Sequence, residues 1–208
     1  MKLRIPWFSL ALLPVLIGLE VATEVHPLWY PAVQRQMALN WEGFRHFELW
    51  RLVTSPLLQD RDGFAGGLMW LVIALVPPLE LRARTAFVAT VFYLGDWLST
   101  VPVLIGLRVA AAFGNAAAER LAFRADSGSS SGAFACAAAL ALTVPGRWRV
   151  PGLLAIFGFL ACRLALYHRL DDVQHTLAAL VGLNLAWACV PRAPSGLSGL
   201  TFFKRTGR

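Results

Sequence analysis

The sequence predicts an all-α membrane protein: a bundle of six transmembrane helices with both termini in the cytoplasm. Of its 208 residues, 57% are hydrophobic and 15% are charged, whereas soluble domains contain roughly 25% charged residues. Apolar windows close to the roughly 20 residues that cross a ~30 Å hydrocarbon core recur along the chain. Six such windows lie at about 6–23, 64–80, 85–105, 130–144, 150–167 and 172–191.

The distribution of basic residues predicts the orientation of the bundle. With six spans and a cytoplasmic N-terminus, ten of the 19 Lys and Arg residues fall in short cytoplasmic connections or at the termini: Lys2, Arg4, Arg82, Arg84, Arg147, Arg149, Arg192, Lys204, Arg205 and Arg208. Basic residues in short loops mark the cytoplasmic side. The net charge of +7 therefore reflects topology. No basic stripe with interleaved aromatic residues predicts a nucleic-acid partner.

The remaining elements follow in chain order. The first window comes after MKLR without a convincing cleavage site, so we expect a retained helix rather than a signal peptide. Residues 24–63, rich in Trp and Pro, predict a long loop along the outer membrane surface. Pro77 and Pro78 are expected to end or kink the second span. Residues 108–126 predict an interfacial helix.

The chain carries no fixed-period repeat and no long linker, which predicts one membrane domain over residues 1–191 and a basic cytoplasmic tail over residues 192–208. We expect an integral, multi-pass protein of a bacterial plasma membrane, with membrane lipids as partners. The three cysteines lack the spacing of a metal site, and we expect no metal and no cofactor. The sequence carries no signal for an oligomeric state.

A serine and a histidine occupy matching positions in two predicted spans. In the stretch DSGSSSGAF at 126–134, Ser130 opens the fourth span at its outer end. In the topology above, His175 lies about one turn below the outer end of the sixth span. Both groups are then at similar depth and open to the same aqueous side. A hydroxyl and an imidazole in such positions can act as a nucleophile and its base.

Each of these residues also has an ordinary structural interpretation. Serines commonly cap helix starts, and a histidine near a helix end is often a satisfied polar residue. Small residues around the pair favour a close approach of the two helices, which a Ser-His hydrogen bond requires and a cap does not. These small residues are Gly128, Gly132, Ala133, Ala135, Ala178, Ala179 and Gly182.

Other polar residues in the spans favour structural roles. Glu20, Glu80 and Arg163 lie near span ends, where we expect them to reach water or headgroups. Asp96 lies deeper in the third span, and we expect it mainly to cap or hydrogen-bond a neighbouring helix.

These residues resemble those of the rhomboid intramembrane serine proteases, of which the chain looks like a divergent member. The resemblance implies a six-helix core with a catalytic serine in a G-x-S motif, here Gly128 to Ser130, and a catalytic histidine in the sixth helix, here His175. Phe134 stands where the family tends to have an aromatic residue near the histidine. Gly182 matches a small residue that follows the histidine.

The similarity covers about residues 50–190. Trp50 and Arg51 resemble a Trp-Arg element of the family's outer loop, and Glu80 falls where a glutamate often closes the second helix. The residue after the nucleophile is usually glycine, but here it is Ser131. A shift of one position would make Ser131 the nucleophile; we prefer Ser130 because it keeps the first glycine of the motif and the spacing to the aromatic residue.

A second departure concerns the donors that stabilise the oxyanion. The family commonly carries a histidine and an asparagine one turn apart in the second span, where this chain has Phe64 and Leu68. The backbone N–H of Ser130 at a helix start is one substitute. Side chains of the outer loop can supply another if the loop folds over the site; the candidates are Gln59, Ser55 and His46.

The resemblance implies hydrolysis of a peptide bond in a transmembrane protein substrate. No acid is placed like the carboxylate of a triad, because Asp171 and Asp172 are expected above His175, so a Ser130–His175 dyad is the simplest form. One alternative is a catalytically weak or inactive relative that binds transmembrane helices without cutting them. Another is a small transporter or lipid-binding protein in which Asp96 and His175 line a pathway, although no paired interrupted helices indicate one.

Overall fold

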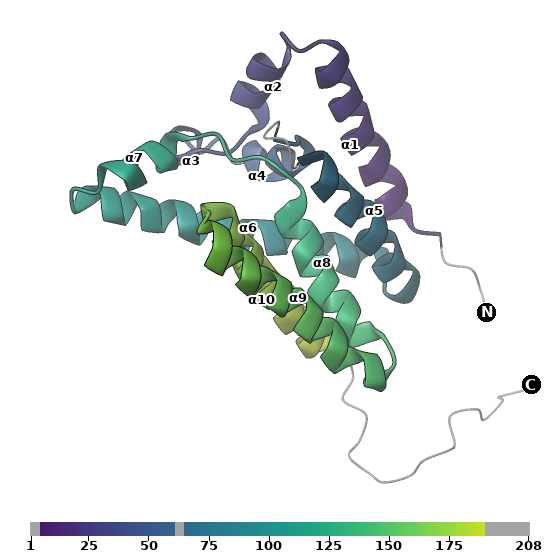
Figure 1. The fold of residues 1–208 in the computed structure, drawn as a ribbon. Coiled ribbons are helices and arrows are strands. Elements are labelled where there is room, and N and C mark those ends of the chain that lie inside the picture. The colour runs from purple at the N-terminus through teal and green to yellow at the C-terminus, as the bar shows by residue number, and fades with distance from the viewer. Residues whose placement is uncertain (1–4, 61–64, 190–208) are drawn as a thin grey trace, which may run out of the picture.

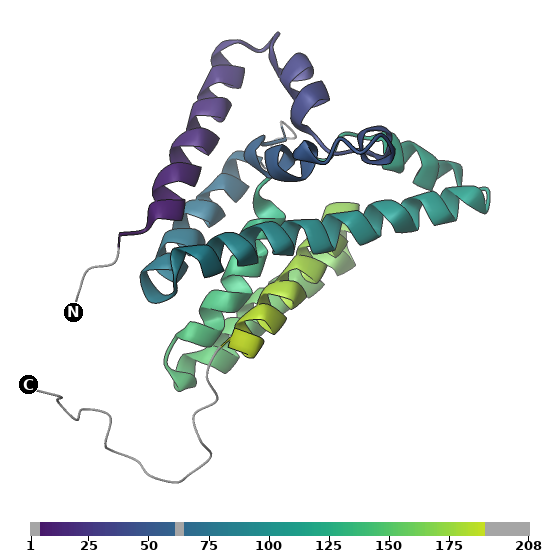
Figure 2. The same cartoon turned by 180° about the vertical axis from the view of Figure 1, so that it is seen from behind.

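The computed structural model describes residues 5–60 and 65–189, which are mainly helical (Figure 1, and from behind in Figure 2). The helices are α1 (Trp7–Val25), α2 (Tyr30–Met37), α3 (Trp41–Arg45), α4 (Trp50–Thr54), a 3-10 turn η1 (Ser55–Leu57), α5 (Ala65–Arg82), α6 (Thr85–Ala112), α7 (Ala116–Phe123), α8 (Ser130–Thr143), α9 (Gly146–Tyr167) and α10 (Leu170–Cys189). No strand is present in these ranges; an isolated antiparallel bridge joins Leu39 to Asp126.

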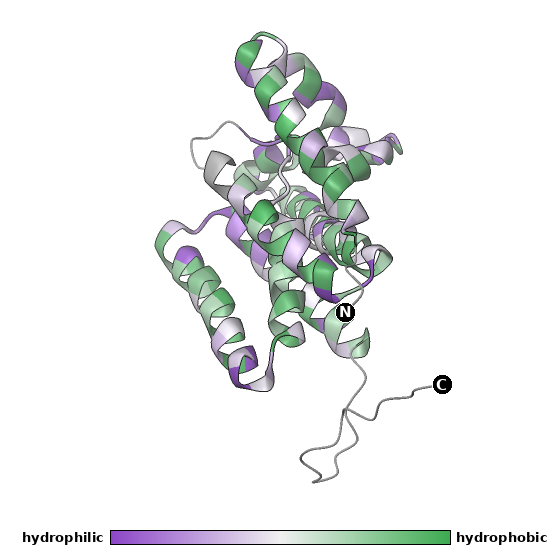
Figure 3. Cartoon of the chain, turned by 90° about the vertical axis from the view of Figure 1, so that its right-hand side faces the viewer, coloured by the Kyte–Doolittle hydropathy of each residue, from purple (hydrophilic) through white to green (hydrophobic). Residues whose placement is uncertain are grey.

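The six predicted windows fall on α1, α5, α6, α8, α9 and α10. Three of these helices, α1, α6 and α9, are long and apolar enough to cross a membrane. Hydrophobic residues dominate the long helices (Figure 3). Helix α8 is apolar but has 14 residues, which corresponds to about 21 Å. The described residues are therefore all-α and compatible with a membrane protein, with three membrane-length helices among the six predicted spans.

Two predicted boundaries are wrong, and of the two outcomes expected at Pro77 and Pro78, an end or a kink of the second span, the end does not occur. Helix α6 continues to Ala112, well beyond the predicted end near residue 105. The predicted interfacial helix over 108–126 is instead divided between the end of α6 and α7, with Gly114 (φ 88°) in the turn between them. Helix α5 does not end at Pro77 and Pro78 but continues to Arg82. Proline removes an N–H donor, but its fixed φ is itself helical, which allows the chain to continue.

Helix α8 lies at the centre of the bundle, against α5, α6, α9 and α10. Its alanine-rich sequence is almost entirely buried. Gly95 of α6 and Gly182 of α10 both face Ala135, and a Cβ added to either glycine would collide with that residue. A Cβ on Gly132 would lie 2.6 Å from the Phe92 ring. The glycines therefore permit α6 and α10 to approach α8 nearly to backbone contact.

Glu80 connects the start of α1 to α5 and α6. Its carboxylate accepts hydrogen bonds from the backbone N–H groups of Phe8 and Ser9 (both 2.8 Å), which belong to the uncapped first turn of α1. It also accepts from the hydroxyls of Ser9 (2.7 Å) and Thr85 (2.6 Å). Glu80 is only 1% exposed, so the expectation that it reaches water or headgroups is wrong.

Residues 26–60, which belong to the predicted outer loop and are called the outer segment below, fold into α2, α3, α4 and η1. The Arg51 side chain holds these elements together: its Nε donates to Glu48, and one Nη donates to the carbonyls of Arg35 and Ala38 (both 2.7 Å). Trp97 of α6 fastens the segment to the bundle through a hydrogen bond from its indole N–H to the Leu52 carbonyl (2.7 Å). Neighbouring Trp50 is an exposed side chain.

Replacing Gly182 with alanine is expected to destabilise the bundle, because the new methyl group would overlap the Ala135 backbone. Overpacking of this kind costs about 1–3 kcal/mol. Gly158 of α9 is the matched control, since a Cβ there meets nothing within 4 Å. Thermal unfolding followed by circular dichroism in detergent should give a lower midpoint for Gly182→Ala than for Gly158→Ala. Equal midpoints would contradict the close approach of α8 and α10.

Candidate active site

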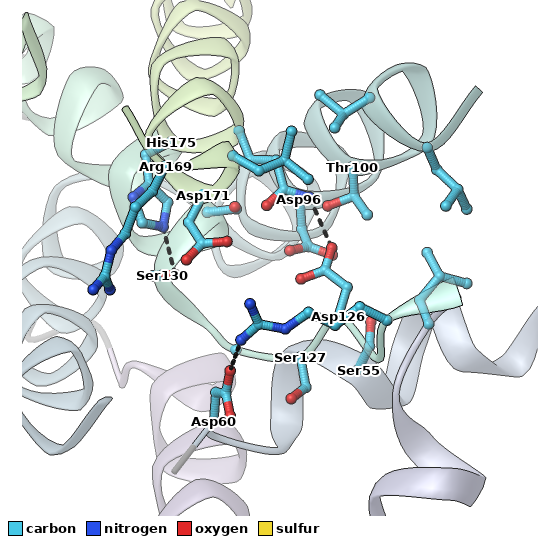
Figure 4. Close-up of a pocket in the computed structure, with 18 of the residues that line it drawn as sticks. Ser55, Asp60, Asp96, Thr100, Asp126, Ser127, Ser130, Arg169, Asp171 and His175 are labelled. Carbon is cyan, nitrogen blue, oxygen red and sulfur yellow. Dashed lines mark hydrogen bonds and ion pairs between the residues drawn. The ribbon is translucent and has the colours of Figure 1, made fainter. Parts of the chain in front are cut away.

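Ser130 and His175 lie within hydrogen-bond distance, although 45 positions separate them in the chain (Figure 4). Ser130 is the first residue of α8, and His175 lies in the second turn of α10. The Ser130 Oγ is 2.7 Å from the His175 Nε2. An imidazole that accepts the serine proton at Nε2 carries its own proton on Nδ1. The arrangement therefore suits transfer of a proton from Ser130 to His175.

Packing, rather than a carboxylate, orients the imidazole. Its Nδ1 is buried and has no hydrogen-bond partner among the described residues. The Phe134 ring, one turn after Ser130, packs against the imidazole with ring centroids 4.8 Å apart. Because a neighbouring ring restricts rotation of the imidazole, Phe134 can hold Nε2 toward the serine.

The acidic side chains near His175 make no hydrogen bond to its imidazole. Asp172, which is fully buried, accepts a hydrogen bond from the Arg163 Nε of α9 at 2.6 Å, and no hydrogen bond to His175 is present. The expectation that Arg163 reaches water is wrong, since its side chain is largely buried in this ion pair. Asp171 lines the cavity described below. The geometry of the described residues is that of a dyad.

The loop before Ser130 is held from two sides. Asp126 exchanges two backbone hydrogen bonds with Leu39 (2.7 and 2.9 Å), and the Gly128 N–H donates to the Ser55 carbonyl (3.1 Å). From α10, the Gln174 amide donates to the Asp126 carboxylate (2.7 Å). Gly128 has φ 138°, a conformation that favours glycine. The outer segment and α10 thus fix where α8 begins.

Ser129 and Gln59 meet beside this helix start. Ser129 occupies the N-cap position, but its side chain makes no capping hydrogen bond. Its hydroxyl donates instead to the Gln59 Oε1 (3.2 Å). Gln59 is 4% exposed, and its Nε2 has no acceptor among the described residues. A buried donor without an acceptor is costly, and a ligand oxygen at this position would satisfy it.

A cavity of about 470 Å³ reaches the Ser130–His175 pair. Its walls come from the outer segment, α6, the loop before α8, and the start of α10 (Figure 4). Its polar lining includes Ser55, Gln59, Asp96, Asp126, Ser130 and His175. A space of this size is large enough for a segment of substrate.

Several other predicted residues lie apart from the pair. Ser131 is buried and lines the cavity, but no hydrogen bond joins it to His175 in the described part of the chain. His46 is exposed and contacts Glu42 (3.0 Å). Phe64 lies outside the described residues, and Leu68 lies in the first turn of α5.

The other residues that carry the family resemblance lie away from the cavity. Trp50, Arg51, Glu80 and Gly182 do not line the cavity. The tail over 192–208 lies outside the described residues. Residues 5–60 and 65–189 contain no group of three or more His, Cys, Asp or Glu side chains that could hold a metal ion.

Sequence reasoning missed two residues of the site, Asp126 and Gln174. Each is a polar residue next to a predicted site element: Asp126 opens the serine-rich motif, and Gln174 directly precedes His175. Their position next to predicted site residues was the signal that could have identified them. Their hydrogen bond joins a loop to a helix 48 positions away, and spacing along the chain does not encode such a pairing.

The stability of the fold is expected to depend on the ionisation of Asp126. Burial raises the pKa of this carboxyl to about 6, above the usual value of about 3.9 in an unfolded chain. The folded state therefore retains the proton that the unfolded state loses, and its stability decreases by about 3 kcal/mol as pH rises from 4 through 6.

Asp126→Asn removes this titration and can still accept from Gln174. Urea unfolding in detergent at several pH values should show the stability of Asp126→Asn, relative to the unaltered protein, increasing from pH 4 to pH 7. The exposed Glu119 of α7 provides a control, Glu119→Gln, for the loss of a surface carboxylate. Parallel pH profiles for Asp126→Asn and the unaltered chain would contradict the prediction.

Comparison with protein-family models, curated proteins and solved structures gives no match.

Proposed function

We propose that this chain is an intramembrane serine endopeptidase that cleaves transmembrane protein substrates with Ser130 and His175 as a dyad. The observation that carries the proposal is the 2.7 Å separation between the Ser130 Oγ and the His175 Nε2. A nucleophile within hydrogen-bond reach of its base is the geometry that serine hydrolysis requires. The adjoining cavity supplies space for a peptide and for water.

The acylation step follows from this geometry. His175 Nε2 takes the proton of Ser130 while the serine oxygen forms a bond to the scissile carbonyl carbon, and the π electrons move to the carbonyl oxygen. When the carbonyl reforms, the C–N bond breaks, and the imidazolium gives its proton to the leaving amine. Ser130 then carries the acyl group as an ester.

Deacylation reverses the roles with water as the nucleophile. His175 takes a proton from a water molecule in the cavity as the water oxygen attacks the ester carbonyl. Collapse of this intermediate breaks the bond to the serine oxygen, which regains the proton from His175. The products are a peptide acid and the free enzyme. Neither step needs a metal or a cofactor.

Two sets of donors are suited to the oxyanion. The first turn of α8 has no side-chain cap, so its N–H groups and the positive end of the helix dipole are not neutralised by the Ser129 hydroxyl. The second donor is the Gln59 Nε2, which lacks an acceptor among the described residues and lines the same cavity. We infer that Gln59 replaces the second-span donors that Phe64 and Leu68 do not provide.

The proposal includes six membrane spans, formed by α1, α5, α6, α8, α9 and α10, with both termini in the cytoplasm. The six predicted windows fall on these helices, and the basic residues of the short connections support the orientation. The short helix α8 is surrounded by four other helices. It therefore need not match the thickness of the lipid by itself.

A fluorophosphonate probe, which reacts with activated serines, tests the function on the purified full chain. We expect labelling of the unaltered protein, with loss of roughly 10³-fold or more in rate for Ser130→Ala and for His175→Ala because either change removes the nucleophile or its base. Ser131→Ala is the matched control and should keep the label.

The other outcomes are informative. Loss of the label in Ser131→Ala but not in Ser130→Ala would move the nucleophile by one position. Absence of labelling, or labelling that survives Ser130→Ala, Ser131→Ala and His175→Ala alike, would contradict serine hydrolysis. The remaining function would then be the binding of transmembrane helices without cleavage.

Gln59→Ala is expected to slow labelling by about 10²- to 10³-fold, the usual effect of removing one oxyanion donor. The control is Gln34→Ala, in the same outer segment, whose amide donates to the Tyr30 hydroxyl (3.2 Å). The measurement is the rate constant of fluorophosphonate labelling of each variant, taken with the same probe at the same pH. A Gln59→Ala rate equal to that of Gln34→Ala would remove Gln59 from the oxyanion site.

A further inference from the structure

Two carboxylates that line the cavity form no ion pair among the described residues. Asp96 of α6 and Asp126 of the loop before α8 both line it, and Figure 4 shows both side chains directed into it. The two carboxyl groups are close enough to influence each other electrostatically. Asp96 is 6% exposed and makes no side-chain hydrogen bond or ion pair among the described residues. The Asp126 side chain accepts only from the neutral Gln174 amide.

The other acids around the cavity are placed near cations. Asp60 contacts Arg124 at 3.5 Å, and Asp172 pairs with Arg163. Asp171 lies within the electrostatic influence of Arg124 and Arg169. Arg124 also acts on Asp126. Asp96, on the α6 side of the cavity, is therefore the lining carboxylate on which no cation acts, and Asp126 is its acidic neighbour.

Two neighbouring carboxylates out of bulk water repel each other, and their loss of hydration is unfavourable unless a cation compensates it. Burial raises the pKa of Asp126 to about 6, so this carboxyl is largely ionised at neutral pH. A cationic group entering the cavity would relieve the repulsion and replace the lost hydration.

The remaining walls fit a basic side chain of a peptide. Val103, Leu104 and Leu107 of α6 also line the cavity, and apolar walls suit the methylene stem of lysine or arginine. The Gln59 Nε2, a buried donor without an acceptor in the described residues, lines the same space. A ligand that presents both a carbonyl oxygen and a cation satisfies both features.

We propose that this cavity binds a lysine or arginine side chain of the substrate, with Asp96 and Asp126 contacting its cationic end. A guanidinium or ammonium group offers several donors to two carboxylates at once. The proposal rests on the proposed function for the cleavage that follows, but the binding of the cation does not require Ser130 to react.

Binding of 4-aminobenzamidine, measured by its fluorescence on the full chain in detergent at pH 7.5, tests the cation site. We expect saturable binding to the unaltered protein and to Ser130→Ala. The neutral analogue 4-aminobenzamide should bind at least about tenfold more weakly, because removing the charge leaves buried carboxylates uncompensated.

Asp96→Asn should weaken amidine binding by at least about tenfold for the same reason. The matched control is Asp60→Asn, a carboxylate of the same cavity that already contacts Arg124, and it should change the affinity by less than about threefold. Equal binding of the amidine and the amide, or equal effects of Asp96→Asn and Asp60→Asn, would overturn the proposal. If Asp96→Asn does not fold, Asp126→Asn replaces it.

Substrate preference separates this proposal from the proposed function. The substrates are transmembrane peptides that carry arginine, lysine or norleucine at one position near the scissile bond. The kcat/KM of the unaltered protein should be about tenfold or more higher for the arginine and lysine peptides than for the norleucine peptide. Asp96→Asn should cleave the three peptides with similar kcat/KM. If the protein binds the amidine but shows no preference for peptides with a basic residue, the cation site does not bind a substrate side chain. Ser130 labelling without amidine binding overturns the cation site alone; amidine binding without labelling overturns proteolysis alone.

Discussion

The contact of Ala135 with Gly95 and Gly182 determines how closely three helices approach, and the rest of the bundle depends on it. Side chains larger than hydrogen at either glycine would separate α6 or α10 from α8. Ser130 lies on α8 and His175 on α10, so the distance between the Ser130 Oγ and the His175 Nε2 is set by the same packing. The alanine-rich sequence of α8 buries less apolar area than larger side chains would, but it allows the neighbouring helices to come close.

The apolar bundle also contains an unusual number of polar side chains, and most of them have partners. Glu80 accepts hydrogen bonds from the first turn of α1, and Asp172 accepts one from Arg163. Among the described residues with an unpartnered buried side-chain atom, Gln59, Ser127 and His175 line one cavity, whereas Arg108 and Asp172 lie outside it. Buried groups that are left unsatisfied are costly. A ligand in the cavity would be able to satisfy the unpartnered groups that line it.

The sequence was informative wherever a signal is local. Apolar windows located the helices, and the serine-rich motif and His175 were identified because polar residues at span ends are conspicuous. Helix boundaries were less accurate, since Pro77 and Pro78 do not stop α5 and apolar composition does not mark the end of α6 at Ala112. The partners of Glu80 and Asp126 could not be predicted, because they belong to elements far along the chain and depend on tertiary packing.

The carboxylate that fixes the start of α1 lies 71 positions after Ser9, one of the residues it binds. In the proposed topology, α1 would enter the bilayer during synthesis before the ribosome has made Glu80, the residue that binds its first turn. Until α5 follows, two backbone amides and a hydroxyl at that end must remain solvated at the membrane surface. Assembly of the N-terminal part of the bundle therefore requires α5, and α1 remains without this partner until α5 has been made.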